Sequence, residues 1–278
     1  MPELPDLVYI ASYLNSAIVG RTIVEVHVKQ PIVIRDTLDI PFDVALIGKT
    51  ISSVTVHGPF VTFGFTEGIE LVINLMLAGG LQHQFPNDKP EGYLCFGLSL
   101  NDGTRVNLGD ERKMAKAYLI KRGLYQLIPK YATQGIDIRS PEFTRDEFRR
   151  LASAGKRKQV RVLINDHTIL SSIGNAYADE ILFDAGIHPK TFVGKLTSDD
   201  IDTLFHSILH VMGWGIEKVT AADRPIHVKV RDHMMVRNRK GEPCPRCGTT
   251  IRREGVRGHD VFFCPRCQPA ARELFITW

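Results

Sequence analysis

The chain has 278 residues, of which 44% are hydrophobic and 24% are charged, with a formal net charge of +4. This composition excludes a disordered or fibrous protein, and the length is sufficient for two domains of ordinary size. No apolar run approaches about 18 residues, so no transmembrane helix is expected. The N-terminus lacks a basic segment followed by an apolar stretch, which predicts a cytoplasmic protein without a secretory signal.

The first expected element is a helix from Pro5 to about Ser16, because Leu7, Ile10 and Leu14 follow helical spacing. A strand-rich region follows this helix. Alternating or apolar segments bounded by turn residues predict eight strands, at 22–28, 32–35, 51–57, 60–65, 70–75, 93–100, 104–108 and 116–120. One helix followed by eight short strands indicates a two-sheet sandwich or flattened barrel over residues 1–128 of an α+β protein.

The character of the sequence changes after Pro129. Residues 129–142 contain Pro, Gly and Ser and are expected to form a linker, and residues 143–223 are expected to be helical. Helices are predicted after the cap Thr144, over 158–165, over 176–185 after the cap Asn175, and after the cap Thr197.

The C-terminal part, residues 224–278, is expected to form a separate basic module. Residues 224–272 carry 12 Lys or Arg against 4 Asp or Glu, a net charge of +8, whereas the remaining residues carry −4. A basic module on a mildly acidic body favours a polyanionic partner, with nucleic acid first and a merely solvated surface as the alternative.

Four of the five cysteines form two C-x-x-C pairs. Cys244 and Cys247 are separated from Cys264 and Cys267 by sixteen residues. This spacing is typical of a tetrahedral Cys₄ zinc site on a small hairpin, and without an open ligand position the single Zn²⁺ is expected to be structural. Cys95 stands alone in an apolar run and is expected to be a buried small hydrophobe.

The N-terminal sequence Met1-Pro2-Glu3 has two interpretations. An initiator Met before a small residue is commonly removed, which would leave Pro2 as a terminal secondary amine. Such an amine titrates near pH 8, about two units below Lys, and is therefore more nucleophilic at neutral pH. Glu3 would lie beside it as a proton donor or acceptor. The alternative is simply a helix start, for which Pro5 is suited.

The segment from Ile173 to Glu180 contains a Gly174-Asn175 pair ahead of an expected helix. The N–H groups at a helix N-terminus favour an anion such as a DNA phosphate. The alternative is an ordinary helix cap.

Five motifs occur in order along nearly the whole chain: residues 2–5 (Pro-Glu-Leu-Pro), 173–180, 186–189 (Gly-Ile-His-Pro), 239–244 and 263–268. Together they resemble the formamidopyrimidine-DNA glycosylase / endonuclease VIII family. The resemblance implies an N-terminal β-sandwich domain, a helix–two-turn–helix domain and a zinc-finger hairpin, with double-stranded damaged DNA in the cleft between the domains.

The resemblance also implies the reaction. Members flip a damaged nucleotide out of the duplex, and the amine of the N-terminal proline attacks C1′ of the deoxyribose. The base leaves, an iminium forms, and elimination cleaves the strand. By this resemblance Pro2 is the nucleophile and Glu3 the acid that helps to open the sugar ring, in a base-excision repair enzyme that is both DNA glycosylase and abasic-site lyase. We expect a monomer.

The DNA contacts implied by the resemblance are spread along the chain. Asn175 matches the phosphate-binding Asn of the family. Arg161 is a candidate phosphate ligand and Lys158 a weaker one, with a solvated helix face as the alternative for both. Arg112 matches the Arg that faces the orphaned base. Leu77 and Met114 take the places of apolar residues that wedge into the vacated stack.

Three positions depart from the family pattern. The usual β-strand Lys falls at Pro59, and no Lys or Arg lies between Thr50 and Asp88, so His57 is the nearest candidate cation. His259 replaces the usual Arg of the zinc hairpin, and Arg257 is a candidate substitute. Asp6 stands where Glu is usual.

These departures leave three possible functions within the family: an active glycosylase/lyase with altered lesion choice, mainly an abasic-site lyase, or a damaged-DNA-binding protein with weak or no activity. A zinc-ribbon protein that binds RNA or a partner protein is the alternative outside the family. The apolar residues of the C-terminal tail are expected to pack on the body or to contact a partner, and they are Leu274, Phe275, Ile276 and Trp278.

Overall fold

The computed structural model describes residues 1–90 and 92–270, which form two compact units. The first unit comprises Met1–Thr133 together with Val219–Val230, and the second comprises Gln134–Lys218 and the residues from Arg231 onward. Within the described residues, no helix combines the length and the apolar character that crossing a membrane requires. The tail residues Leu274, Phe275, Ile276 and Trp278 lie outside the described part of the chain.

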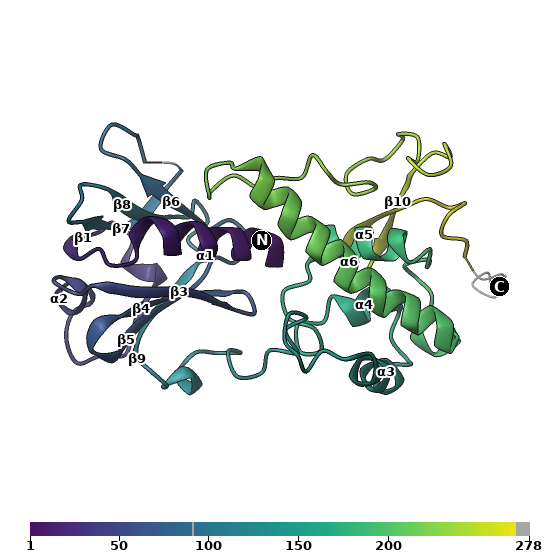
Figure 1. Ribbon diagram of the computed structural model, residues 1–278, viewed down its shortest axis with the longest axis horizontal. Helices are drawn as coiled ribbons and strands as arrows, with labels where there is room; N and C mark the ends of the chain where they lie inside the picture. The colour runs from purple at the N-terminus through teal and green to yellow at the C-terminus, as the bar shows by residue number, and fades with distance from the viewer. Residues whose placement is uncertain (91, 271–278) are drawn as a thin grey trace. The chain divides into compact units, whose positions relative to one another are not determined.

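The first unit is one helix with two sheets (Figure 1). Helix α1 spans Leu4–Ile18. The four-stranded sheet has the order β1-β7-β8-β6, and the five-stranded sheet has the order β2-β9-β5-β4-β3. The strands are β1 Ile23–Val28, β2 Ile34–Asp36, β3 Ile51–His57, β4 Phe60–Phe65, β5 Ile69–Asn74, β6 Gly80–Gln84, β7 Leu94–Leu100, β8 Arg105–Gly109 and β9 Lys116–Lys121.

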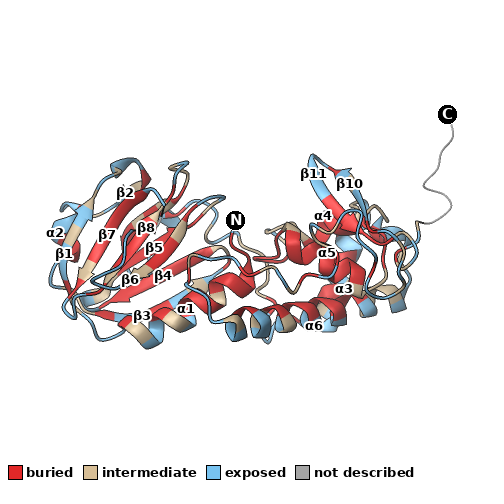
Figure 2. Cartoon of the chain, turned by 90° about the horizontal axis from the view of Figure 1, so that it is seen from above, coloured by how far each residue is buried: buried red, intermediate tan, exposed pale blue. Residues whose placement is uncertain are grey.

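The inner faces of the two sheets form the core of the first unit (Figure 2). Strand β4 is buried along all six residues, as expected for a continuous apolar run between two neighbouring strands. Leu7, Leu14 and Ile18 on the inner face of α1 join the same apolar cluster. The expected α+β sandwich is therefore confirmed.

The eight predicted strands are present, and a ninth strand, β6, was not predicted. Its residues Gly80-Leu-Gln-His-Gln carry only one large apolar side chain, so no alternation marks the strand. Its pairing with β8 stabilises it instead. The short helix α2, Phe42–Leu46, was also not predicted, nor were the 3₁₀ turns Pro31–Val33, Thr66–Gly68, Tyr125–Leu127 and Val193–Lys195.

The second unit is helical and ends in a hairpin. Its elements are α3 Arg145–Ala154, α4 Val160–Ile164, α5 Asn175–Asp184, α6 Ser198–Ala222, β10 Arg252–Val256 and β11 His259–Phe263. The predicted caps hold: Thr144 Oγ1 accepts the N–H of Glu147 at 3.2 Å, and Thr197 Oγ1 accepts that of Asp200 at 3.1 Å. Helix α5 begins one residue before its predicted start, because Gly174 rather than Asn175 is the extended residue at its N-terminus.

The compact units divide the chain differently from the expected domain boundaries. Residues 129–142 are not an exposed linker: Tyr131 stacks on the ring of Tyr125 at 4.7 Å, and Ile138 and Phe143 are buried. The expected boundary at residue 223 falls within the segment Val219–Val230, which belongs to the first unit. Its Ile226 and Val230 are buried in the same apolar cluster as α1 and the sheets, a tertiary contact that no local pattern reveals.

Candidate functional site

Two buried carboxylates organise the N-terminus. The N–H of Glu3 donates to Asp6 Oδ2 at 2.8 Å, and the two residues form a reciprocal capping box at the start of α1. Glu3 is 6% exposed and Asp6 is 5% exposed. The shorter Asp6 side chain, which departs from the family pattern, is thereby committed to the cap. Glu3 stays next to the terminal residues, as expected from the sequence.

The terminal amine lies on a loop from the far end of β5. The amine of Met1 donates to the carbonyl oxygen of Leu77 at 3.1 Å. Half burial, and next the neighbouring ammonium of Lys229, lower the pKa of this amine from 8.0 to about 6. The carboxylates of Glu3 and Asp6 oppose that shift. An amine in these surroundings is largely unprotonated, and hence nucleophilic, at neutral pH.

The loop that accepts this hydrogen bond presents Leu77 to solvent. Leu77 is 51% exposed, which is unusual for a leucine between a buried strand and a tight turn. Met76 has a φ of 52°, and its N–H is held by Asn74 Oδ1 at 2.9 Å. Gly79 closes the turn because a Cβ there would lie 2.4 Å from the carbonyl oxygen of Leu75. The loop is therefore preformed, with its apolar tip outward.

The carboxylate of Asp110 holds a second loop of the first unit. Asp110 is 1% exposed and accepts the N–H groups of Arg112 at 2.9 Å, Met114 at 2.8 Å and Ala115 at 2.7 Å. The side chain of Arg112 is exposed and that of Met114 is half-buried. Ala115 lies against Gly79, since a Cβ added at Gly79 would lie 3.2 Å from the Cβ of Ala115. The two predicted wedge loops are therefore neighbours, with Arg112 on the second.

The hairpin between β3 and β4 carries no cation other than a candidate histidine. His57 pairs with Phe60 across the turn, and Gly58 and Pro59 form its tip. His57 Nε2 donates to the carbonyl oxygen of Tyr131 at 3.0 Å, and its ring stacks on that tyrosine at 4.3 Å. His57 is thus tied to the chain after the sandwich, and Pro59 leaves the turn without a charge.

Lys229 is a candidate that the sequence patterns did not reveal. Its segment is held in the first unit by Tyr9, whose hydroxyl donates to the carbonyl oxygen of Arg224 at 2.8 Å, and by the buried Ile226 and Val230 on either side of it. The only sequence signal was the general excess of basic residues after 223. Its position beside the terminal amine depends on tertiary packing.

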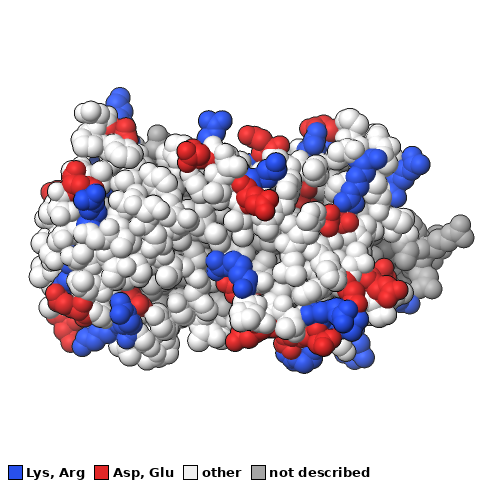
Figure 3. Space-filling view, in the orientation of Figure 1, with Lys and Arg blue, Asp and Glu red and all other residues white. Residues whose placement is uncertain are grey.

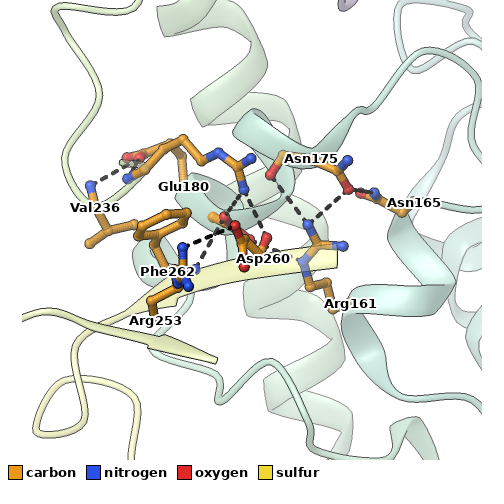
Figure 4. Close-up of polar contacts among 10 residues, drawn as sticks. Arg161, Asn165, Asn175, Glu180, Val236, Arg253, Asp260 and Phe262 are labelled. Carbon is orange, nitrogen blue, oxygen red and sulfur yellow. Dashed lines mark hydrogen bonds and ion pairs between the residues drawn. The ribbon is translucent and has the colours of Figure 1, made fainter. Parts of the chain in front are cut away.

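In the second unit, the amide of Asn175 is held by two donors (Figure 4). Arg161 Nη2 donates to Asn175 Oδ1 at 2.9 Å and Asn165 Nδ2 donates to the same oxygen at 2.8 Å. Arg161 is 2% exposed, because its Nε donates to Asp179 Oδ1 at 3.0 Å. This corrects the expectation of Arg161 as a direct phosphate ligand: in the structure its guanidinium is occupied by buried partners. Lys158 Nζ is likewise paired, with Asp166 at 2.6 Å.

The four cysteines of the two C-x-x-C pairs come together. Their sulfur atoms all lie within 4.8 Å of one another, with Cys247 and Cys264 at 3.5 Å and Cys244 and Cys267 at 3.9 Å. A tetrahedral zinc ion with Zn–S bonds of about 2.3 Å separates its sulfurs by about 3.8 Å, so the donor set fits Zn²⁺. Cys95 lies apart and is buried, as predicted.

The hairpin next to the cysteines presents two of the predicted DNA-binding residues. Arg257, with a φ of 47°, and His259 are exposed at the turn between β10 and β11. Arg246 instead anchors the first cysteine knuckle: its Nη1 donates to the carbonyl oxygen of Phe183 at 2.7 Å, at the end of α5. On the face shown in Figure 3, basic and acidic side chains are interspersed.

Family models match three consecutive parts of the chain. They are the formamidopyrimidine-DNA glycosylase N-terminal domain at residues 1–117, the formamidopyrimidine-DNA glycosylase H2TH domain at 135–224, and the zinc finger found in FPG and IleRS at 241–270. The chain belongs to the formamidopyrimidine-DNA glycosylase family. The three matches correspond to the sandwich, the helical region with Asn175 and the four-cysteine hairpin.

Individual members of the formamidopyrimidine-DNA glycosylase family are similar over nearly the full length. The formamidopyrimidine-DNA glycosylase of Symbiobacterium thermophilum is 31% identical over 100% of this chain and 92% of its own, and that of Chloroflexus aurantiacus is 31% identical over 96% and 98%. Lactococcus lactis Fpg, solved in complex with DNA containing an abasic site, has a TM-score of 0.86 at 25% identity and covers 96% of this chain and 100% of its own. The MutM (Fpg) protein of Thermus thermophilus has a TM-score of 0.83 at 26% identity and covers 97% and 100%.

Proposed function

We propose that the protein is a bifunctional DNA glycosylase and abasic-site lyase of base-excision repair, which acts on oxidised or otherwise damaged bases through a Schiff base on Pro2. The observation that carries this proposal is the environment of the terminal amine. It combines a lowered pKa, a buried carboxylate at Glu3 and an exposed apolar residue, Leu77, on the loop that accepts its hydrogen bond.

Removal of Met1 transfers the free amine to Pro2, which is buried at the start of α1. The Pro2 nitrogen attacks C1′, the N-glycosidic bond breaks, and the base leaves with a proton. Opening of the sugar, with Glu3 protonating the ring oxygen, gives a cationic iminium. Loss of a C2′ proton to a base then expels the 3′ phosphate, and a second elimination expels the 5′ phosphate. An abasic-site aldehyde enters the same path by losing water.

We assign the DNA contacts to both units. The Asn175 amide and the hairpin tip at Arg257 and His259 bind phosphates, while Leu77 and Met114 fill the space of the flipped nucleotide beside Arg112. The partner is double-stranded damaged DNA, bound by one protein monomer. A structural Zn²⁺ on the four cysteines maintains the hairpin.

Borohydride trapping tests the proposal. The protein is incubated with duplexes carrying an abasic site, 8-oxoguanine or an oxidised pyrimidine, and mass spectrometry first establishes whether Met1 is removed. Reduction of the iminium should give a covalent protein–DNA adduct on a Pro2 terminus. A matched protein with an N-terminal extension keeps the Pro2 nitrogen as an amide and should give none. Absence of an adduct with every duplex would contradict the Schiff-base mechanism.

The second candidate is an abasic-site lyase, or a damaged-DNA-binding protein, with little glycosylase activity. The uncharged turn at Pro59 favours it, because departure of an intact base needs more assistance than condensation with a free aldehyde. The same assay separates the candidates. An adduct with the abasic duplex alone indicates the lyase, and tight binding without any adduct indicates the binding protein.

A further inference from the structure

The amide of Asn175 has a defined orientation. Its Oδ1 accepts from the cationic Arg161 and from Asn165, so this end of the amide faces the protein. Among the described residues, Asn175 Nδ2 donates no hydrogen bond. The side chain is half-buried, and it presents its two N–H donors alone at the first turn of α5. Donors at a helix N-terminus suit a phosphate diester.

The residue that orients Asn175 is itself held in the interior. The side chain of Arg161 is 3% exposed and that of its ion-pair partner Asp179 is 0% exposed, with Nε and Oδ1 at 3.0 Å. If Arg161 turned outward to a phosphate, the Asp179 carboxylate would lose one of its two cations inside the protein, which is strongly unfavourable. Arg161 is therefore placed to direct Asn175 rather than to replace it at the DNA.

Asp179 connects this arrangement to the cysteine hairpin (Figure 4). Its Oδ2 accepts from Arg237 Nη1 at 2.7 Å and from the N–H of Phe262, on β11, at 3.3 Å. Arg237 Nη1 also donates to the carbonyl oxygen of Asp260, on the same strand, at 2.9 Å. One carboxylate thus contacts α4 through Arg161 and the hairpin through Arg237 and Phe262.

The next residue of α5 strengthens the same connection. Glu180 is 2% exposed and accepts three backbone N–H groups that precede the hairpin, those of Met235 at 2.9 Å, Val236 at 3.0 Å and Arg237 at 2.9 Å. Two consecutive acidic residues of α5 therefore bind the chain that leads into the metal site. The hairpin cannot shift without changing the partners of both.

We propose that Asp179 and Arg161 are positioning residues that couple the cysteine hairpin to the amide of Asn175, so that phosphate binding by Asn175 depends on the fold of the hairpin. The hairpin acts on this phosphate through the chain from Asp179 to Arg161 to Asn175, in addition to any contact made by its own tip. The inference rests on the proposed function in one respect, namely that the anion at Asn175 is a DNA phosphate.

Salt-dependent binding of the zinc-loaded full-length protein to a duplex with a stable abasic-site analogue tests this coupling. Asn175→Ala should weaken binding about tenfold, the loss of one hydrogen bond to a charged group. Arg161→Gln should weaken binding by a similar factor without changing the slope of log K against log salt. The double variant should be no weaker than the weaker single variant, because both remove the same contact.

The opposite results overturn the proposal. A slope reduced by about one unit in Arg161→Gln would identify a direct phosphate contact. Additive losses in the double variant would show that Arg161 does not act through Asn175. Arg150→Gln is the matched control, because it removes an exposed guanidinium of the same unit that is 68% accessible, and it should bind as the unaltered protein does.

Two further variants separate positioning from misfolding. Asn165→Ala removes the second donor to Asn175 Oδ1 without touching the ion pairs, and it also removes an Asn165 oxygen that is buried without a partner. It should keep the thermal stability, weaken binding severalfold and have no effect in the Asn175→Ala background. Asp179→Asn keeps the side-chain volume, and its binding loss should likewise vanish in that background. Losses that persist there would refute the coupling.

Failure of the proposed function gives a different result. If Asn175→Ala binds DNA as tightly as the unaltered protein, no phosphate is bound at Asn175, whatever the Arg161 variants do. If Asn175→Ala weakens binding while Arg161→Gln, Asn165→Ala and Asp179→Asn do not, DNA binding at Asn175 stands and the positioning inference is wrong.

Discussion

The amine of Met1 donates a hydrogen bond of 3.1 Å to the carbonyl oxygen of Leu77, 76 residues later in the chain. This contact places the N-terminus beside a leucine that is 51% exposed at the tip of a preformed loop. In the proposed reaction the amine attacks a flipped nucleotide, and Leu77 occupies the space that the nucleotide vacates. The hydrogen bond therefore sets the spacing between the nucleophile and the wedge.

Leu77→Ala should impair DNA processing without impairing the fold. The side chain is half-exposed, so the free energy of unfolding should change by less than about 0.5 kcal/mol. Loss of the apolar wedge should lower the rate of adduct formation with damaged duplexes by about tenfold, measured in single-turnover trapping. Val44→Ala, at an apolar residue of α2 that is 59% exposed, is the control. Equal rates for both variants would exclude a wedge role for Leu77.

Lys229→Gln should move the pH dependence of trapping to higher pH. Removing a cation beside the terminal amine raises the amine pKa, so a smaller fraction is unprotonated near neutrality. The rising limb of the profile should shift upward by roughly half to one pH unit, and the rate should recover at alkaline pH. Lys229→Arg should retain the original profile. Lys29→Gln, a charge change at an exposed site of the same unit, should leave the limb in place.

An unchanged limb in Lys229→Gln would show that this lysine does not influence the reacting amine. A rate that falls equally at every pH would instead indicate a contact with the DNA. The profile thus distinguishes tuning of the amine from phosphate binding.

Asp110→Ala should destabilise the first unit and release the loop that carries Arg112 and Met114. The buried carboxylate accepts three backbone N–H groups, and its loss leaves these donors unpaired. We expect a loss of about 2–4 kcal/mol in the free energy of unfolding, measured with denaturant. Asp39→Ala, at an exposed aspartate, should change it by less than about 0.5 kcal/mol. A loss below about 1 kcal/mol would refute the role assigned to Asp110.

Chelation should release one Zn²⁺ per chain and abolish specific DNA binding. The hairpin has a small apolar cluster of its own, which includes Cys244 and Cys264, and the metal supplies most of its folding free energy. Metal content by elemental analysis and binding by titration check this prediction. Cys264→Ser should lose the metal, whereas Cys95→Ala, outside the cluster, should keep it. A purified protein that contains no metal would contradict the assignment.

Local sequence signals predicted the elements whose partners are close in the chain. Eight strands, the caps at Thr144 and Thr197 and the four-cysteine spacing follow from alternation, hydrogen-bonding side chains and ligand geometry, all of which act within a few residues. Strand β6 escaped because its neighbour β8, rather than its own composition, stabilises it.

The sequence by itself determined the α+β sandwich, the four cysteines and, through ordered motifs, the family with its expected Pro2 nucleophile. Only the tertiary structure decided that Lys229 lies beside the terminal amine and that Arg161 is turned inward to Asp179. The physical reason is that charge and burial depend on which distant segments pack together. A basic residue reads the same in sequence whether it faces solvent or a buried carboxylate.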